Sequence, residues 1–271
     1  MGKAKDIILR PISAQEANAL VKRVHYSGKV VNNSQLHIGV FYQGKLEGAM
    51  QFGPSLDKRK IQGLVSGTAW HEFIELNRMA FTDVLPRNSE SRAIAVAMRL
   101  LRKHAPQVKW VITFADGTQC GDGTIYRAAG FVLTGIKKND QIWAAPDAGA
   151  RESRTSLTDN RSKSQQSAAR RLSRVTATKA NNIMETGAAS MRPFIEAGFK
   201  PLQGFQLRYI YFIDPAYRQR LTVPELPYSA IADAGARMYK GERLDTRPVN
   251  GDDLATSEAG RFNSEPGALS E

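Results

Sequence analysis

Apolar residues along the chain follow two periods, which together predict an alternation of strands and helices. Continuous or two-residue apolar patterns predict strands at residues 6–12, 36–42, 47–52, 72–81, 109–115, 131–136 and 207–213. Apolar positions spaced three and four residues apart predict helices at 14–24, 90–104 and 124–129. Local signals support three boundaries, because Ser13 is a typical helix N-cap, Gln43-Gly44-Lys45 a hairpin turn and Gly130 a helix stop.

The predicted elements follow one another in the order β-α-β-β-β-α-β-α-β, and the seventh strand, at 207–213, comes last. This order predicts an α/β fold with one mixed sheet flanked by helices. A basic stretch interrupts the order before the last strand.

The composition is that of a globular chain, with 271 residues of which 42% are hydrophobic and 24% are charged. The single cysteine, Cys120, cannot form an internal disulfide or a site of several thiolates. We therefore expect a reducing compartment, the cytoplasm. The sequence shows no signal peptide and no membrane-spanning run, so we expect no membrane partner.

The formal net charge is +12, and a folded protein this basic attracts polyanions such as nucleic acid. Residues 151–180 hold eight basic and two acidic residues, whereas residues 241–271 hold three basic and seven acidic ones. We therefore divide the chain into a catalytic core (1–150), a basic insertion (151–180), the rest of the core with the last strand (181–230) and a flexible tail (231–271) that is acidic from 241. The insertion is either a solvated linker or a segment that contacts DNA phosphates.

Three local features resemble the GNAT acyltransferases. A strand ending near Phe81 leads through a turn into a helix whose first N–H groups could hold a pyrophosphate. The strand at 109–115 is followed by a short helix, and the segment from Tyr126 through Gly130 to Phe131 is similar to the Tyr-x-x-x-Gly-Phe segment of that family. The resemblance implies a GNAT-like mixed sheet and acetyl-CoA or a related acyl donor as cofactor.

A further resemblance covers roughly residues 20–230. Its segments are Glu75-Leu76-Asn77-Arg78, 86–92, Phe114-Ala115-Asp116-Gly117, Gly123-Thr124-Ile125-Tyr126, 204–212 and 220–224. They resemble the Mom DNA-modification proteins of Mu-like phages. The resemblance implies a transferase in the host cytoplasm that adds a carbamoylmethyl-type group to adenine N6 in double-stranded DNA and so shields the DNA from restriction endonucleases.

Two residues are candidates for moving the protons of such a reaction. The N6 amine is a weak nucleophile, so an enzyme needs a group that accepts its proton and a donor for the leaving group. Asp116 ends a buried strand and is our candidate acceptor, although an Asp-Gly turn or a helix cap needs the same residue. Tyr126 is our candidate donor, the alternative being a tyrosine packed on the inner face of its helix.

Other candidate residues would bind the cofactor and the DNA. Arg78 lies among apolar strand residues and needs an anion, either a phosphate or a carboxylate such as Glu75 or Glu90. The turn residues Arg87, Asn88 and Ser91 are candidates for cofactor binding, although helix capping would also explain the last two. Tyr26 and His25 could contact an extruded base, with a structural role as the alternative for His25. The arginines proposed for the DNA backbone are Arg170, Arg171 and Arg174.

Metal binding is left open, because the four histidines show no metal-ligand spacing. The resemblance implies that iron is a possible cofactor, with His25 or His71 as candidate ligands. Two other functions stay open at this stage: an ordinary N-acetyltransferase acting on a small molecule or a protein amine, and a basic DNA-binding protein without catalysis. The oligomeric state is not indicated by the sequence.

Overall fold

The computed structural model describes residues 3–146, 151–158, 190–239 and 242–244. The main sheet consists of β1 (Ile8–Pro11), β2 (Leu36–Tyr42), β3 (Lys45–Gly53), β4 (Phe73–Phe81), β5 (Trp110–Asp116), β6 (Val132–Asn139) and β10 (Gly204–Phe212). The helices around it are η1 (Lys3–Asp6), α1 (Ala14–Val24), α2 (Lys58–Gln62), α3 (Ser89–His104), α4 (Thr124–Ala128), η2 (Pro215–Arg220) and α9 (Ser229–Asp233). The remaining elements are β7 (Ile142–Ala144), β8 (Arg151–Ser153), α5 (Arg154–Thr158), α8 (Arg192–Glu196), β9 (Lys200–Pro201), β11 (Met238–Tyr239) and β12 (Glu242–Arg243).

The seven strands form one mixed sheet in the order β1-β2-β3-β4-β5-β10-β6. All neighbouring strands are antiparallel except β4 and β5, which run parallel. The late strand β10 is inserted between β5 and β6, although the 64 residues 140–203 separate it from β6 in the chain. The predicted fold class, a mixed sheet flanked by helices, is confirmed.

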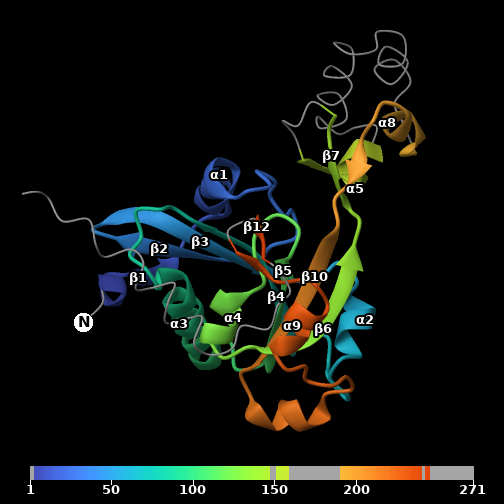
Figure 1. Cartoon of the computed structure of the whole chain (residues 1–271). Coiled ribbons are helices and arrows are strands. Elements are labelled where there is room, and N and C mark those ends of the chain that lie inside the picture. The colour runs from blue at the N-terminus through green and yellow to red at the C-terminus, as the bar shows by residue number, and fades with distance from the viewer. Residues whose placement is uncertain (1–2, 147–150, 159–189, 240–241, 245–271) are drawn as a thin grey trace, which may run out of the picture.

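Helices cover both faces of the sheet (Figure 1). On one face, α3 and α4 pack on the large core cluster through Ile94, Met98 and Tyr126. On the other face, α1 packs on Ala49 of β3, and α2 packs on Trp110 and Ile112 of β5. Because side chains alternate along a strand, each residue of β4 and β5 can be assigned to one of these two faces.

The local signals named above are found in the structure. Ser13 caps α1 in a capping box, in which its hydroxyl accepts a hydrogen bond from the N–H of Glu16 and its own N–H donates to the Glu16 carboxylate. The turn between β2 and β3 places Gln43 and Gly44 at φ angles of 49° and 80°, a left-handed conformation that suits a tight hairpin. Helix α1 has the predicted bounds.

A small arm extends from the main sheet on β6 and β10 (Figure 1). It contains the three-stranded sheet β8-β7-β9 and the helices α5 and α8. Its core is separate from that of the main sheet and consists of Trp143, Ala145, Leu157, Met191, Phe194 and Phe199. The sequence did not reveal the arm, because strands of two or three residues carry too little of a repeating pattern.

The chain continues to pack on the core after residue 230. Ile231 of α9 and Ala236 are buried in the large core cluster, inside the segment that was predicted as tail.

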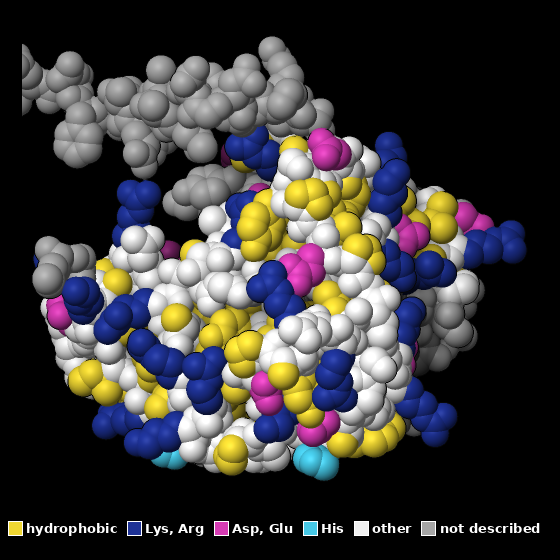
Figure 2. Space-filling model, turned by 90° about the horizontal axis from the view of Figure 1, so that it is seen from below, with side chains coloured by type: hydrophobic (Ala, Val, Ile, Leu, Met, Phe, Trp, Pro, Cys, Tyr) yellow, Lys and Arg dark blue, Asp and Glu magenta, His cyan; other side chains and the backbone are white. Residues whose placement is uncertain are grey.

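Among the described helices, none has the length and hydrophobicity of a membrane span. The face seen in Figure 2 carries many scattered Lys and Arg side chains and fewer Asp and Glu, consistent with the net positive charge.

Candidate active site

The main sheet opens between β4 and β5. These strands pair only where Phe73–Glu75 lies beside 110–112, and beyond this point both strands continue without pairing with each other. The register of β4 against β3 also shifts between Leu76 and Arg78, so that Asn77 is an extra residue in the strand. Such a bulge bends a strand and redirects its side chains. Beyond Glu75 and Ile112, the backbones of β4 and β5 therefore separate from each other.

Asp116 ends β5 at this opening, on the face that carries α1 and α2. One carboxylate oxygen accepts a hydrogen bond of 2.9 Å from the N–H of Thr118, and the other accepts one of 3.3 Å from the amide of Gln119. The carboxylate thus stabilises the turn that follows β5. It is only partly buried, so it also remains available to a substrate.

Tyr26 and His25 reach Asp116 from the end of α1. The Asp116 carboxylate lies close to the hydroxyl of Tyr26, and burial together with this negative charge raises the pKa of Tyr26. Tyr26 therefore stays protonated at neutral pH. The residue as a whole is 49% exposed, although its hydroxyl is buried, and its ring lies 4.3 Å from the ring of His25, measured between ring centroids. An exposed aromatic ring beside a carboxylate provides a surface on which a base can stack.

His25 is uncharged at neutral pH. Burial and the positive charge of Arg78 lower its pKa to about 4, against the opposing effect of Asp116. Its Nδ1 accepts a hydrogen bond of 3.2 Å from the N–H of Ser27 and lies 2.8 Å from the Ser27 hydroxyl. The neutral imidazole therefore carries its proton on Nε2, which can donate a hydrogen bond.

This lowered pKa predicts how stability depends on pH. As the pH falls from about 6.5 towards 4, the unfolded chain binds a proton at this histidine and the folded chain does not, so the folded state loses stability. We expect His25→Gln to lose less free energy of unfolding than the wild type between pH 7 and pH 5, measured by urea denaturation. His104→Gln, at the exposed end of α3, is the matched control. An equal loss in His25→Gln and the wild type would contradict the assignment.

Arg78 points to the same face as Asp116 and is held by backbone carbonyl groups. Its Nε donates to the carbonyl of Lys29 at 3.2 Å, and a terminal nitrogen donates to the carbonyl of Asn77 at 3.0 Å. Neither Glu75 nor Glu90 lies within ion-pair distance, and among the described residues no other carboxylate does. The charge of Arg78 is thus positioned without an anionic partner of its own.

Tyr126 approaches the opening from the other face. It is 9% exposed and packs against Phe131 and Tyr209. Burial raises its pKa to about 12, and Thr113 lies close to its hydroxyl. Tyr126 is therefore a proton donor, not a base, at neutral pH. Its helix can lie this close because Gly123 has no side chain, where a Cβ would come within 2.4 Å of the ring of Tyr209.

The turn before α3 lies on the same face as Tyr126. Asn88 has a φ of 69° and makes no side-chain cap, while the hydroxyl of Ser91 donates to the Asn88 carbonyl at 3.3 Å. The N–H groups of Glu90 and Ser91 have no acceptor in the described part of the chain. The Ser89 hydroxyl is buried without a partner. Arg87 is exposed in this turn.

Sequence reasoning missed one residue of the site, Thr113. Thr113 contacts Tyr126 and donates to the carbonyl of Leu76 across the opening, and Glu90 and Cys120 lie near Tyr126. Burial and the charge of Asp116 raise the pKa of the Cys120 thiol, so it stays protonated at neutral pH.

Some candidates remain apart from the site. Arg170, Arg171 and Arg174 lie outside the described residues. His71 lies in the loop before β4.

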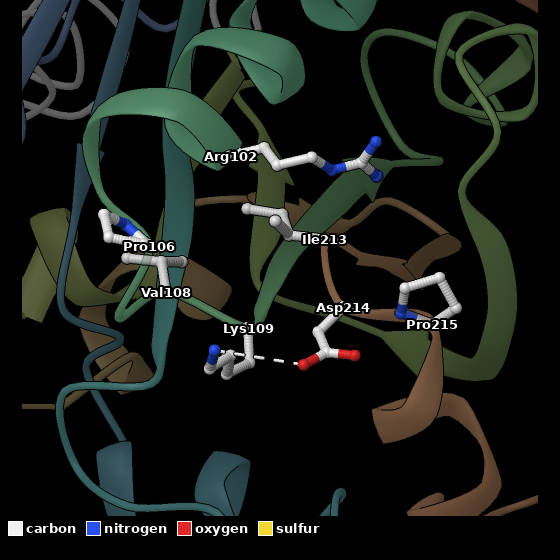
Figure 3. Close-up of a pocket in the computed structure, with 7 residues that line it drawn as sticks. All are labelled: Arg102, Pro106, Val108, Lys109, Ile213, Asp214 and Pro215. Carbon is white, nitrogen blue, oxygen red and sulfur yellow. Dashed lines mark ion pairs between the residues drawn. The ribbon is translucent and has the colours of Figure 1, made fainter.

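A pocket lies at the opposite end of β5 from Asp116 (Figure 3). It is lined by Arg102, Pro106, Val108, Lys109, Ile213, Asp214 and Pro215. It contains an ion pair of 3.9 Å between Lys109 and Asp214 but none of the candidate catalytic residues.

Comparisons with known proteins show the family to which the chain belongs. The family model of the Mom protein family matches residues 6–230. The protein named methylcarbamoylase mom of Escherichia phage Mu is 41% identical over 133 residues, which are 49% of this chain and 55% of that protein. The chain therefore spans about half the length of this relative.

Among solved structures, a GNAT family acetyltransferase from Elizabethkingia anophelis with bound acetyl-CoA aligns with a TM-score of 0.38 and 11% identity, covering 76% of this chain and 98% of that one. The ribosomal-protein-S18-alanine N-acetyltransferase from Escherichia coli aligns with a TM-score of 0.39 and 9% identity, covering 76% of this chain and 94% of that one. Because the family model covers most of the sequence, the chain belongs to the Mom protein family.

Proposed function

We propose that this chain is a transferase that modifies the N6 amine of adenine in double-stranded DNA. The observation that carries the proposal is the convergence of Asp116, Tyr26, His25 and Arg78 on one side of the β4–β5 opening, with Tyr126 on the other. The name of the phage Mu relative, methylcarbamoylase, supports a transferase that adds a small carbonyl-containing group.

The acceptor base belongs on the face that carries α1. In duplex DNA the N6 amine is not accessible to an enzyme cleft, so the adenine has to leave the helix. The half-exposed ring of Tyr26 can stack on the extruded base, and Nε2 of His25 can donate to a ring nitrogen. Asp116 is the carboxylate that lies beside Tyr26 in the described part of the chain, and it accepts a proton from the N6 amine.

The reaction needs two proton movements. As the N6 nitrogen bonds to the electrophilic carbon of the donor, the bond between that carbon and its leaving group breaks. Asp116 takes the proton that the nitrogen loses, and Tyr126 can give its proton to the leaving group, since its pKa of about 12 keeps it protonated. The unpaired positive charge of Arg78 stabilises negative charge that develops between them.

The turn before α3 fits the phosphates of an acyl donor such as acetyl-CoA. The free N–H groups of Glu90 and Ser91 and the buried hydroxyl of Ser89 are hydrogen-bond donors at the positive end of a 16-residue helix. Asn88, Ser91 and Arg87 belong to this turn and would hold the donor with them. A thioester bound there would supply an activated carbonyl carbon, and its thiol would be the leaving group. Acetyl-CoA itself would give N6-acetyladenine, whereas a methylcarbamoyl or carbamoylmethyl group would need a donor that carries the nitrogen of that group.

Iron does not fit the residues present. Among the residues that the structure describes, no group of three or more His, Cys, Asp and Glu side chains could hold a metal ion. We therefore assign no step of the reaction to a metal.

Mass spectrometry of nucleosides tests the proposal. DNA from cells that express the chain is expected to contain a new adenosine species that control cells lack. Carbamoylmethyl and methylcarbamoyl groups are isomers, so fragmentation of the species, not its intact mass, identifies the group. Acetylation of a small amine or a protein by the purified chain, with unmodified DNA in the cells, would contradict the proposal and favour an ordinary N-acetyltransferase.

The same cells test the biological role. In the proposed role, modified DNA resists cleavage by restriction endonucleases whose sites contain adenine. We place the enzyme in the cytoplasm of the host cell, where phage DNA is exposed to these nucleases.

A further inference from the structure

The β6–β10 ribbon leaves the main sheet directly beside Asp116. Gln206 of β10 pairs with Asp116 of β5 on one side and with Lys137 of β6 on the other. Residues paired in this way point to the same face of a sheet. Gln206, Asp116 and Lys137 form a row across three strands. Strand β5 ends at this row, whereas β6 and β10 continue towards the arm. Lys137 and Gln206 are both exposed.

The arm presents a second row of the same kind. Ala144 of β7 pairs with Arg151 of β8 and with Lys200 of β9. The neighbouring residue Trp143 is buried in the core of the arm, so the row of Ala144 points the other way, to the face that does not pack on this core. Arg151 and Lys200 are exposed, and neither forms an ion pair with a described residue.

We propose that Lys137, Arg151 and Lys200 form a track that binds the phosphate backbone of duplex DNA and holds the duplex while one base lies at Asp116. The track carries three positive charges, with a small alanine between two of them, so a backbone can approach closely. Arg151 and Lys200 lie on paired strands of the arm, which has its own core, and Lys137 lies on β6 of the main sheet.

The reach of the arm sets the length of DNA that it can contact. Lys200 lies six residues before Gln206, which corresponds to about 20 Å of extended chain. Stacked base pairs rise about 3.4 Å each, so the track reaches phosphates roughly six base pairs from the extruded base. The track depends on the proposed function in one respect only: the proposed function says that the base at Asp116 is the adenine to be modified.

Salt-dependent DNA binding tests the track. We expect Arg151→Gln/Lys200→Gln to flatten the slope of log K against log salt by about 2, since each lost phosphate contact removes about 0.9. Lys45→Gln/Lys103→Gln removes the same charge from the β2–β3 hairpin and the end of α3, and is expected to keep the wild-type slope. Both pairs are exposed, so folding is not expected to change.

Duplex length gives the second measurement. On a duplex that extends only about three base pairs on either side of the target, Arg151→Gln/Lys200→Gln and the wild type are expected to bind with the same affinity and the same salt slope. On a duplex that extends about ten base pairs on either side, their salt slopes are expected to differ. Equal slopes for the two double variants on the long duplex would overturn the track. An arm-dependent slope in a chain that leaves DNA unmodified would keep the track and refute the proposed function instead.

Discussion

Asp116→Asn is expected to lower the modification of adenine by about 10²- to 10⁴-fold, the usual contribution of a positioned general base. The asparagine keeps an oxygen that accepts from the N–H of Thr118, so the turn after β5 is preserved. It cannot take a proton from the N6 amine. The thermal midpoint is therefore expected to stay within a few degrees of the wild type.

Asp214→Asn is the matched control for this variant. Asp214 also accepts a hydrogen bond from the N–H two residues later, that of Ala216, but it lies in the pocket at the other end of β5. It is expected to retain wild-type modification. A large fall in the thermal midpoint of Asp116→Asn, with modification that follows the amount of folded protein, would show that Asp116 only stabilises the turn.

Tyr126→Phe is expected to cause the second large loss, about 10²-fold in modification. The ring that packs against Phe131 and Tyr209 is retained, and only the hydroxyl is lost. Thr113 keeps its hydrogen bond to the carbonyl of Leu76, so the cost in stability is expected to be about 1 kcal/mol.

Tyr228→Phe is the matched control, because it removes a tyrosine hydroxyl that lies outside the site. Tyr228 donates to the carbonyl of Phe131 at 2.8 Å and takes no part in the proposed reaction. Purified variants are compared by their modification of DNA and by thermal unfolding. Similar modification by Tyr126→Phe and Tyr228→Phe would remove Tyr126 from the mechanism.

Much of the fold could be predicted because its elements have strong local signals. Helix α1 has an amphipathic pattern and a capping box, and the hairpin after Tyr42 has a glycine where the backbone turns left-handed. The arm could not be predicted, since its core joins Trp143 to Phe194 and Phe199, some fifty residues later. Contacts of this kind are set by tertiary packing and leave no periodic pattern.

The candidate site could be predicted only in part. Asp116 and Arg78 lie near the ends of adjacent strands, so the sequence could suggest that they converge, and the structure brings Tyr26 and His25 to them. The environment of Arg78 could not be predicted, because its partners are carbonyl groups and not the carboxylates of Glu75 or Glu90. Gln206 was also missed, since its place beside Asp116 depends on the register of a strand ninety residues away.

The fraction of modified adenine in DNA from cells that express the wild type or Asp116→Asn, at equal levels of folded protein, tests the central claim most directly. The account predicts a new adenosine species with the wild type and a fraction at least about 10²-fold lower with Asp116→Asn. Equal fractions in the two would contradict the role of Asp116, and unmodified adenine with the wild type would contradict the proposed function itself.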